Sequence, residues 1–390
     1  MNTLRIKKVE GKSEISAFHR LPFLIYKNDA RWIPHIRQEV EGIFDPKQNK
    51  HFTHGECQRW ILLRDDLVIG RIAAFINRRK AHSFKQPTGG LGFFECIENF
   101  EAASLLFDTA KEWLMARGME AMDGPINFGE NNKYWGLIVE NYELPTYHGQ
   151  NYNPPYYKSF FERYGFQVYY YQLINYRKLN DVVPEKFREK AKFILQDKNF
   201  DIQHIKTDRI EKYAEDFRIV YNAAWVTHDG FKEMAREVAL SIFKKMKRII
   251  DERLVCFAYY QQRPVAFCLC IPDLNQIFRK LNGNLNLLGK VKFILFKSLT
   301  KITRINGVAI GVHPEFQKRG LECALFSDLA NRLQGKTSYQ DIVVTWVGDF
   351  NPKMQHICEE VGFRVRVKMA TYRILFDPAK TFERSPIIHQ

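Results

Sequence analysis

A basic turn between an apolar strand and a helix is the part of this sequence best suited to chemistry. The segment GVAIGVHPEFQKRGLECALFSDLANRL contains Gln317, Lys318, Arg319 and Gly320 where its helical portion begins. The first turn of a helix presents unpaired backbone N–H groups and the positive end of the helix dipole. Gly320 would let the backbone approach a ligand closely, and Lys318 and Arg319 add positive charge. This arrangement predicts a site for a pyrophosphate group.

The elements that must position this turn occur twice in the chain. RWILLRDDLVIGRIAAFIN, with its turn at Asp65, and RLVCFAYYQQRPVAFCLCI, with its turn at Gln262, each read as two short strands joined by polar residues. A later Asn-Pro pair, beginning at Asn153 or Asn351, opens a helical segment that ends at a Gly-Phe pair. The hairpin turn and the Asn-Pro pair lie 88 residues apart in the first half and 89 in the second. We interpret this pattern as a tandem duplication.

Amphipathic helices fill the gaps between these strands in both halves. Apolar residues recur at helical spacing before Gly118 and again before Gly335. Each half therefore reads as two helices, a strand hairpin, a strand, a helix, a strand, a helix and a final strand, which predicts a mixed α/β (α+β) domain. The sequence KLNDVVP interrupts the pattern, so we place the domain boundary there, which gives domains 1–180 and 181–390.

Two motifs resemble those of a known superfamily. VHPEFQKRGLECAL, beginning at Val312, resembles the V-x-P-x-x-Q/R-x-x-G-x-G/A signature of the GCN5-related N-acetyltransferase (GNAT) superfamily. NPKMQHICEEVGF, beginning at Asn351, resembles the N-x-x-A-x-x-x-Y-x-x-x-G-F segment of the same superfamily. The chain as a whole looks like tandem bacterial acyltransferase-like proteins. The resemblance implies two tandem GNAT-like domains, each with a mixed central sheet flanked by helices.

The resemblance also implies the ligands and the residues that hold them. It implies an N-acyltransferase that uses acetyl-CoA, or a longer acyl-CoA, as co-substrate and acts on an amine. The implied coenzyme-binding residues are Val312, Gln317, Lys318, Arg319, Gly320, Leu321 and Asn351. The matching stretch of the first half, GFFECIENFEAAS, is acidic and lacks the glycine loop. We therefore expect one coenzyme site, in the second half, and a degenerate N-terminal domain.

The chain departs from the superfamily pattern at two positions. Glu322 stands where the signature has glycine or alanine, and a carboxylate beside a pyrophosphate costs about 1–4 kcal/mol. Cys358 stands where many members of the superfamily carry a general-acid tyrosine. The Cys358 thiol could return a proton to the leaving coenzyme A thiolate, or it could pack in the core, and both readings stay open.

An amine acceptor must lose a proton, and the superfamily uses carboxylates, histidines or water chains for this step. The candidates in this sequence are His228 and Asp229 in WVTHDGF, and Asp349 in WVGDFN. Each of them also has a structural interpretation, as a cap on a helix or a loop. We predict Asp349, His228 and Cys358 as the catalytic residues.

A cationic and apolar insertion separates two strands of the second half. Between Asp273 and Glu315 the sequence has no acidic residue, while seven lysines and arginines alternate with aliphatic and aromatic residues. This composition is typical of a helix that lies on anionic lipid, although a core helix with solvated lysines has the same pattern. We predict peripheral membrane contact through residues 287–305, which would suit a long-chain acceptor amine and a fatty acyl donor.

Composition excludes several other classes of protein. The 390 residues include 45% hydrophobic and 26% charged residues, which are ordinary globular values. The sequence shows no apolar run as long as a membrane span or typical of a signal peptide. We therefore expect a cytoplasmic protein that can lie peripherally at the inner membrane face. Seven cysteines without a CxxC pair favour reduced thiols over disulfides or zinc, so we expect no metal.

The net charge of +15 keeps two other function classes open. A basic surface suits any anionic partner, so a tandem transferase that takes an aminoacyl group from tRNA is one alternative, although nucleic acid is not the partner that we expect. The other alternative is a non-catalytic protein that binds acyl-CoA or another ligand on a decayed GNAT scaffold. Glu322 and the missing tyrosine favour that reading. The pattern assigns no oligomeric state.

Overall fold

The first half of the chain contains the predicted order of helices and strands, with a short strand or helix added at three places. The computed structural model describes residues 3–226 and 233–388. The elements of the first half are β1 (Leu4–Lys8), α1 (Lys12–Ile25), α2 (Arg37–Phe44), β2 (Gly55–Arg64), β3 (Leu67–Asn77), α3 (Arg78–Ala81), β4 (Thr88–Cys96), α4 (Phe100–Met115), β5 (Ala121–Gly124), β6 (Leu137–Glu140), α5 (Tyr156–Tyr164) and β7 (Gln167–Lys178).

The second half repeats this order and adds a helix before its first strand and an insertion before its fourth. Its elements are α6 (Glu185–Gln196), β8 (Phe200–His204), α7 (Ile210–Trp225), α8 (Arg236–Met246), β9 (Val255–Tyr260), β10 (Arg263–Pro272), α9 (Asn275–Phe278), α10 (Leu287–Leu299), β11 (Arg304–Val312), α11 (Leu321–Leu333), β12 (Asp341–Gly348), α12 (Pro352–Val361) and β13 (Arg364–Leu375). No helix in the described ranges is both long and apolar enough to cross a membrane.

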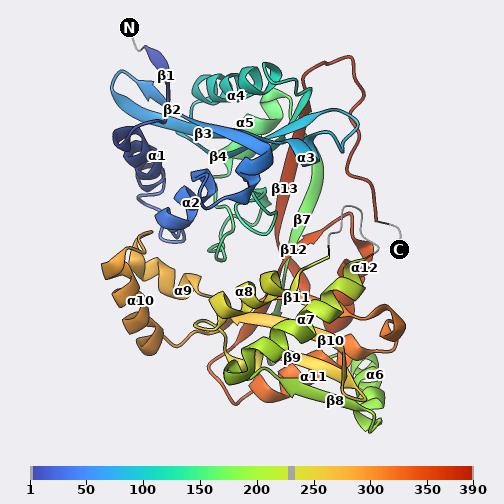
Figure 1. The fold of residues 1–390 in the computed structure, drawn as a ribbon. Coiled ribbons are helices and arrows are strands. Elements are labelled where there is room, and N and C mark those ends of the chain that lie inside the picture. The colour runs from blue at the N-terminus through green and yellow to red at the C-terminus, as the bar shows by residue number, and fades with distance from the viewer. Residues whose placement is uncertain (1–2, 227–232, 389–390) are drawn as a thin grey trace.

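One mixed sheet runs through the whole molecule (Figure 1). Among the described residues its strands follow the order β1-β2-β3-β4-β5-β13-β7-β12-β11-β10-β9-β8, and β6 pairs with β13 outside this order. Parallel pairs join β4 to β5 and β11 to β12, and the other neighbours are antiparallel. The predicted class, a mixed α/β fold with a central sheet flanked by helices, is confirmed.

The two halves exchange their last strands. β13, from the end of the chain, lies between β5 of the first half and β7, while β7 pairs with β12 of the second half. The β13–β7 ladder runs from Arg364 opposite Tyr176 to Arg373 opposite Gln167. Backbone hydrogen bonds therefore connect the strands of the two halves in one continuous sheet.

Alternation along the strands builds a core on each face of the sheet. In β9, Cys256 and Ala258 belong to the core beneath α6, α11 and α12, while Val255, Phe257 and Tyr259 belong to the core beneath α7 and α8. Successive side chains of a strand point to opposite faces, so a continuous apolar run such as that of β9 contributes to both cores.

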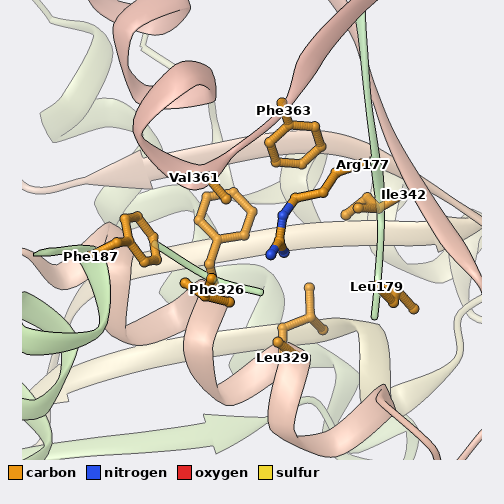
Figure 2. Close-up of a pocket in the computed structure, with 10 residues that line it drawn as sticks. Arg177, Leu179, Phe187, Phe326, Leu329, Ile342, Val361 and Phe363 are labelled. Carbon is orange, nitrogen blue, oxygen red and sulfur yellow. The ribbon is translucent and has the colours of Figure 1, made fainter. Parts of the chain in front are cut away.

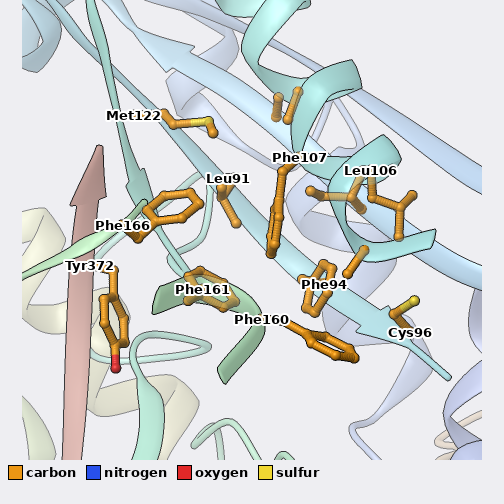
Figure 3. Close-up of a cluster of buried hydrophobic side chains, with 14 of the residues drawn as sticks. Leu91, Phe94, Cys96, Leu106, Phe107, Met122, Phe160, Phe161, Phe166 and Tyr372 are labelled. Atoms are coloured by element: carbon orange, nitrogen blue, oxygen red, sulfur yellow. The ribbon is translucent and has the colours of Figure 1, made fainter. Parts of the chain in front are cut away.

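The core of the first half is rich in aromatic rings that contact one another (Figure 3). Phe107 of α4 is fully buried, with its ring centroid 4.8 Å from Phe94 of β4 and 4.9 Å from Phe161 of α5. Tyr372 of β13 completes this cluster, with its ring 5.4 Å from Phe161. The core of the first half therefore depends on a side chain from the end of the chain.

Candidate active site

Strands β11 and β12 lie side by side and then separate. Their parallel pairing begins at Arg304 and ends at Gly307, opposite Val344. Val308 is left out of the pairing between β11 and β10, which makes a bulge at this point. From Val308 to Val312 the described structure has no pairing between β11 and β12, so the backbone of this stretch can bind a ligand.

The basic turn that follows β11 leads into α11 with its backbone donors free. The Gln317 side chain donates to the Val312 carbonyl at 3.2 Å and fixes the start of the turn. Lys318 and Gly320 have φ angles of 63° and 91°, and Gly320 is the N-cap of α11. Within the described residues, none of the backbone N–H groups from Lys318 to Cys323 has a hydrogen-bond partner. A row of free donors at the positive end of a helix is what an anion site requires.

Helix α6 packs across the start of α11 and links it with α12. A Cβ atom on Gly320 would lie 3.2 Å from the Lys190 Cβ of α6. The close approach to Gly320, which the sequence predicts for a ligand, is therefore made by helix α6. Lys190 donates to Glu360 of α12 at 3.0 Å. Glu360, and to a smaller extent Glu322, raises the pKa of Lys190, so this lysine offsets the charge of Glu322. The two basic side chains of the turn are exposed.

Asp349 and Asn351 hold the end of β12 in place. The Tyr171 N–H donates to Asp349 Oδ1 at 3.0 Å, and Arg384 pairs with Oδ2 at 2.5 Å. Asn351 accepts a hydrogen bond from the Met354 N–H at 3.0 Å, as the N-cap of α12. The structure thus gives both residues structural contacts, and their roles in proton transfer and coenzyme binding stay predictions.

Cys358 lies on α12 in the core of the second half. It is 3% exposed, and burial raises the pKa of its thiol to about 12, so the thiol is protonated at neutral pH. Leu321 is buried in the same core, and Val312 packs at its edge. The proton transfer predicted for Cys358 stays a prediction, and His228 and Asp229 lie outside the described residues.

The cysteines as a group are free and mostly buried. All seven are unpaired, and only Cys57 is partly exposed. In the described ranges, no group of three or more His, Cys, Asp and Glu side chains is placed to hold a metal ion. The sulfur atoms of this chain therefore serve mainly as packing groups.

The matching place in the first half is filled by the protein's own backbone. The Ile126 N–H donates to the Leu91 carbonyl of β4 at 2.8 Å, and a Cβ atom on Gly92 would lie 1.7 Å from the Ile126 carbonyl oxygen. At the start of α4, the Asn99 side chain accepts from the Ala102 N–H at 2.7 Å. The space beside β4 and one donor in the first turn of α4 are thus already used, which favours a single coenzyme site in the second half.

Three neighbouring strands of the central sheet carry buried polar atoms that have no partner among the described residues. These atoms are Gln172 Oε1, Asn175 Nδ2 and Arg177 Nε on β7, Trp346 Nε1 on β12 and Asn306 Oδ1 on β11. Each such atom costs about 1–3 kcal/mol when it is buried without a partner. Trp346 also has a φ angle of 64°, and it lies at the point where the register between β12 and β7 shifts. These residues were not predicted from the sequence, although a glutamine and an asparagine inside the apolar strands YYYQLINY and RINGVAI were a visible signal.

A small cavity lies between α6, α11, α12 and the sheet (Figure 2). Arg177 of β7 extends into it beside Phe326 and Phe363. Arg177 is 5% exposed and donates to the Asp181 carbonyl at 2.7 Å, while its Nε has no partner in the described structure. The cavity measures about 20 Å³, which is room for one water molecule, so it does not hold a coenzyme or an acyl chain.

A buried carboxylate lies at the other end of β11. Asp273 is 4% exposed, accepts from the Asn275 N–H at 3.1 Å, and donates its own N–H to the Arg304 carbonyl. Burial raises the pKa of Asp273 from 3.8 to about 6. The folded protein therefore binds this proton more tightly than the unfolded chain does. The resulting stabilisation is full below about pH 4 and is lost as the pH rises through 6.

Replacing Asp273 with asparagine should stabilise the protein at pH 7.5, by up to about 3 kcal/mol, because the amide keeps an acceptor without the buried charge. Near pH 4 the same change should have almost no effect. Urea unfolding at pH 7.5 and at pH 4 measures the change in stability under each condition. The control is Asp66→Asn, which makes the same change at a fully exposed aspartate. A variant that is less stable than the parent at pH 7.5 would mean that the ionised carboxylate is favourable in the fold.

The architecture matches solved structures of acetyltransferases. A tandem GNAT protein from the clavulanic acid biosynthesis pathway superposes with a TM-score of 0.55 at 11% identity, over 97% of this chain and 100% of that one. A GCN5-related N-acetyltransferase from Sphaerobacter thermophilus superposes with a TM-score of 0.50 at 12% identity, over 98% of each chain.

Two relatives are similar in sequence over nearly the whole chain, and no family model matches. A protein named bacterial ceramide synthase, from Caulobacter vibrioides, is 26% identical over 381 residues, which is 95% of this chain and 96% of its own length. Protein YghO from Escherichia coli is 22% identical over 357 residues, or 90% of each chain. The duplicated order of elements, the parting of β11 from β12 and the superpositions agree with the resemblance of the motifs: this chain has the fold of a tandem GNAT protein.

Proposed function

We propose that this protein is an N-acyltransferase that moves an acyl group from acyl-CoA to an amine. The observation that carries the proposal is the turn before α11, where the N–H groups from Lys318 to Cys323 are free in the described structure, beside a strand that has separated from β12. These donors and the exposed Lys318 and Arg319 suit a pyrophosphate, and the unpaired end of β11 suits the extended arm of the coenzyme.

In the proposed reaction, the amine nitrogen attacks the thioester carbonyl and the carbon–sulfur bond breaks. The amine loses one proton and the coenzyme thiolate gains one, so no further reactant is needed. Unpaired N–H groups of β11 would stabilise the oxyanion, and the fixed strands would orient the reactants. Asp349 and His228 are the candidates for accepting the amine proton. Cys358 is the weaker candidate for protonating the thiolate, because its thiol is buried in the core.

We propose a long-chain, lipid-like amine as the acceptor and a fatty acyl group as the donor. The support is the relative named bacterial ceramide synthase, since a ceramide is the amide of a long-chain amino alcohol and a fatty acid. The unpaired atoms of Gln172, Asn306 and Trp346 are two acceptors and one donor. An amino alcohol head group carries the complementary hydroxyl and amine groups and would satisfy them.

We also propose that residues 1–180 and 181–390 are the two copies of the duplication, and that the second copy alone binds the coenzyme. The support is the match between β4, α4, β5, α5 and β7 and the later series β11, α11, β12, α12 and β13. In the first copy, the chain at Ile126 closes over β4. The first copy would then contribute its final strand and contacts to the acceptor. An enzyme that uses acyl-CoA belongs in the cytoplasm.

Binding calorimetry with coenzyme A, acetyl-CoA and palmitoyl-CoA tests the donor. We expect micromolar binding of the free coenzyme and tighter binding of palmitoyl-CoA. The double variant Lys318→Glu/Arg319→Glu should weaken binding roughly tenfold or more, because two charges beside the pyrophosphate are reversed. Lys244→Glu/Lys245→Glu on α8 makes the same change in net charge and should bind normally. Equal loss in both double variants would mean that the basic turn has no special role.

Mass spectrometry of the products tests the transfer itself. With palmitoyl-CoA, the protein should form an amide with a long-chain amino alcohol and little amide with a short polar amine. Coenzyme binding with no amide from either amine would favour a non-catalytic binding protein. No coenzyme binding, together with salt-dependent binding of aminoacyl-tRNA, would favour the tRNA-dependent transferase instead.

A further inference from the structure

Helix α10 presents an apolar face to solvent. Six of its aliphatic side chains, between 52% and 82% exposed, are Leu287, Leu288, Val291, Ile294, Leu295 and Leu299, which we call the α10 face. At 100° per residue they fall within an arc of about 140° on one side of the helix. The alternative that this segment is a core helix is therefore wrong for the described structure, because its aliphatic residues point outward.

The opposite side of α10 is firmly attached to the protein. Phe293 stacks on Phe278 of α9, with ring centroids 5.7 Å apart, and Gly289 is buried. The cluster around Phe278 includes Ile33 and Ile36 of the first half. Figure 1 shows α10 beside α9 at the edge of the molecule. The α10 face is thus held in a fixed orientation relative to both halves.

Positive charge surrounds the α10 face. Lys290 and Lys292 lie on the two flanks of the apolar arc, on a helical wheel. Arg279, Lys280 and Lys301 lie just before and after the helix, and the sequence from 274 to 314 contains no acidic residue. An apolar stripe bordered by cations is the pattern of a helix that lies in the interface of a bilayer. With 13 residues, α10 is too short to span one.

We propose that α10 lies flat in the surface of an anionic phospholipid bilayer, with the α10 face among the acyl chains and the flanking lysines at the phosphates. The proposal goes beyond acyl transfer and does not depend on it, since it concerns binding to lipid without any substrate. The location would be the inner face of the membrane, where an amphiphilic acceptor amine is also at hand.

Charge argues against a second copy of this chain as the occupant. In a two-fold contact the same patch meets itself, so the lysines of one copy would face those of the other. A bilayer with anionic head groups instead has an apolar interior that matches the α10 face. Its negative surface charge matches the lysines that border this face.

Sedimentation with lipid vesicles tests the proposal. The full-length protein should bind vesicles of phosphatidylcholine and phosphatidylglycerol and should bind pure phosphatidylcholine much more weakly. Leu288→Gln/Val291→Gln/Ile294→Gln should reduce binding roughly tenfold or more. The control triple variant is Leu67→Gln/Val182→Gln/Phe193→Gln, which removes three exposed apolar side chains from other surfaces and should bind normally.

A second pair of variants separates charge from apolar contact. Lys290→Gln/Lys292→Gln should weaken binding to the anionic vesicles roughly tenfold or more, whereas Lys244→Gln/Lys245→Gln on α8 should not. Equal binding to both vesicle types, or unchanged binding by the α10 triple variant, would overturn the proposal. The proposal would also be overturned if the parent protein formed a dimer and bound no vesicles, and the α10 triple variant were a monomer. The assay contains no acyl-CoA, so a failure here is distinct from a failure of the acyl-transfer proposal.

Discussion

Residues 1–180 and 181–390, produced as separate chains, should each fail to form a stable native domain. The first piece lacks β13, which pairs with β5 and brings Tyr372 into the aromatic core. The second piece lacks β7, which pairs with β12 and β13. Each piece would expose unpaired strand edges and part of an apolar core, so we expect little cooperative unfolding and a strong tendency to aggregate. Circular dichroism during urea unfolding, with size-exclusion chromatography, measures both properties.

Co-production of the two pieces is the matched control, because it restores every strand pair without restoring the peptide bond at residue 180. The assembled pair should show the cooperative unfolding of the intact chain. A monomeric, cooperatively folded 1–180 would contradict the prediction. In that case β7 would have taken the place of β13 beside β5, as in an unexchanged domain.

Gly320→Glu should weaken coenzyme A binding by roughly fivefold to a thousandfold, since a carboxylate beside the pyrophosphate costs about 1–4 kcal/mol. Two further effects act in the same direction. The φ angle of 91° disfavours any residue with a Cβ, and that atom would press against Lys190 of α6 at 3.2 Å. Calorimetry with coenzyme A gives the affinity, and urea unfolding gives the stability of the same preparation.

Gly335→Glu at the far end of α11 is the control for this variant. Gly335 also has a positive φ angle, 67°, but a Cβ there would meet no atom within 4 Å. It should therefore cost a similar backbone strain and leave coenzyme binding intact. Gly320→Ala separates the strain from the charge and should bind more tightly than Gly320→Glu. If Gly320→Glu binds as the parent does, the turn is not the pyrophosphate site.

Local patterns in the sequence predicted the elements well, because they depend on neighbouring residues. The short apolar run of β9 and the Asn-Pro start of α12 correspond to a buried strand and a capped helix in the structure. The strand exchange was out of reach for the same reason. β7 (QVYYYQLINYRK) and β13 (RVRVKMATYRIL) hold equivalent places in the element order of the two halves, and nothing in either sequence says which half each will complete.

The site shows the same division between local and distant information. The turn from Gln317 to Gly320 was visible because its glycine and its charges are adjacent in the sequence. Lys190 was not, since it comes from a helix that starts more than a hundred residues earlier. Likewise, the sequence of α10 could not distinguish a core helix from a surface helix, because exposure depends on what the rest of the chain packs against it.

The position of β13 also sets the order in which the protein can be completed during synthesis. β5 ends at Gly124, but the strand that covers its edge is finished only at Leu375, roughly 250 residues later. At about 5–20 residues per second, a ribosome needs some 10–50 seconds to make that stretch. During that time the nascent first half waits with an open sheet edge, so its folding should depend on chaperones, and slow translation of the second half should lower the yield. The last strand of the described residues is thus the one that closes the middle of the sheet.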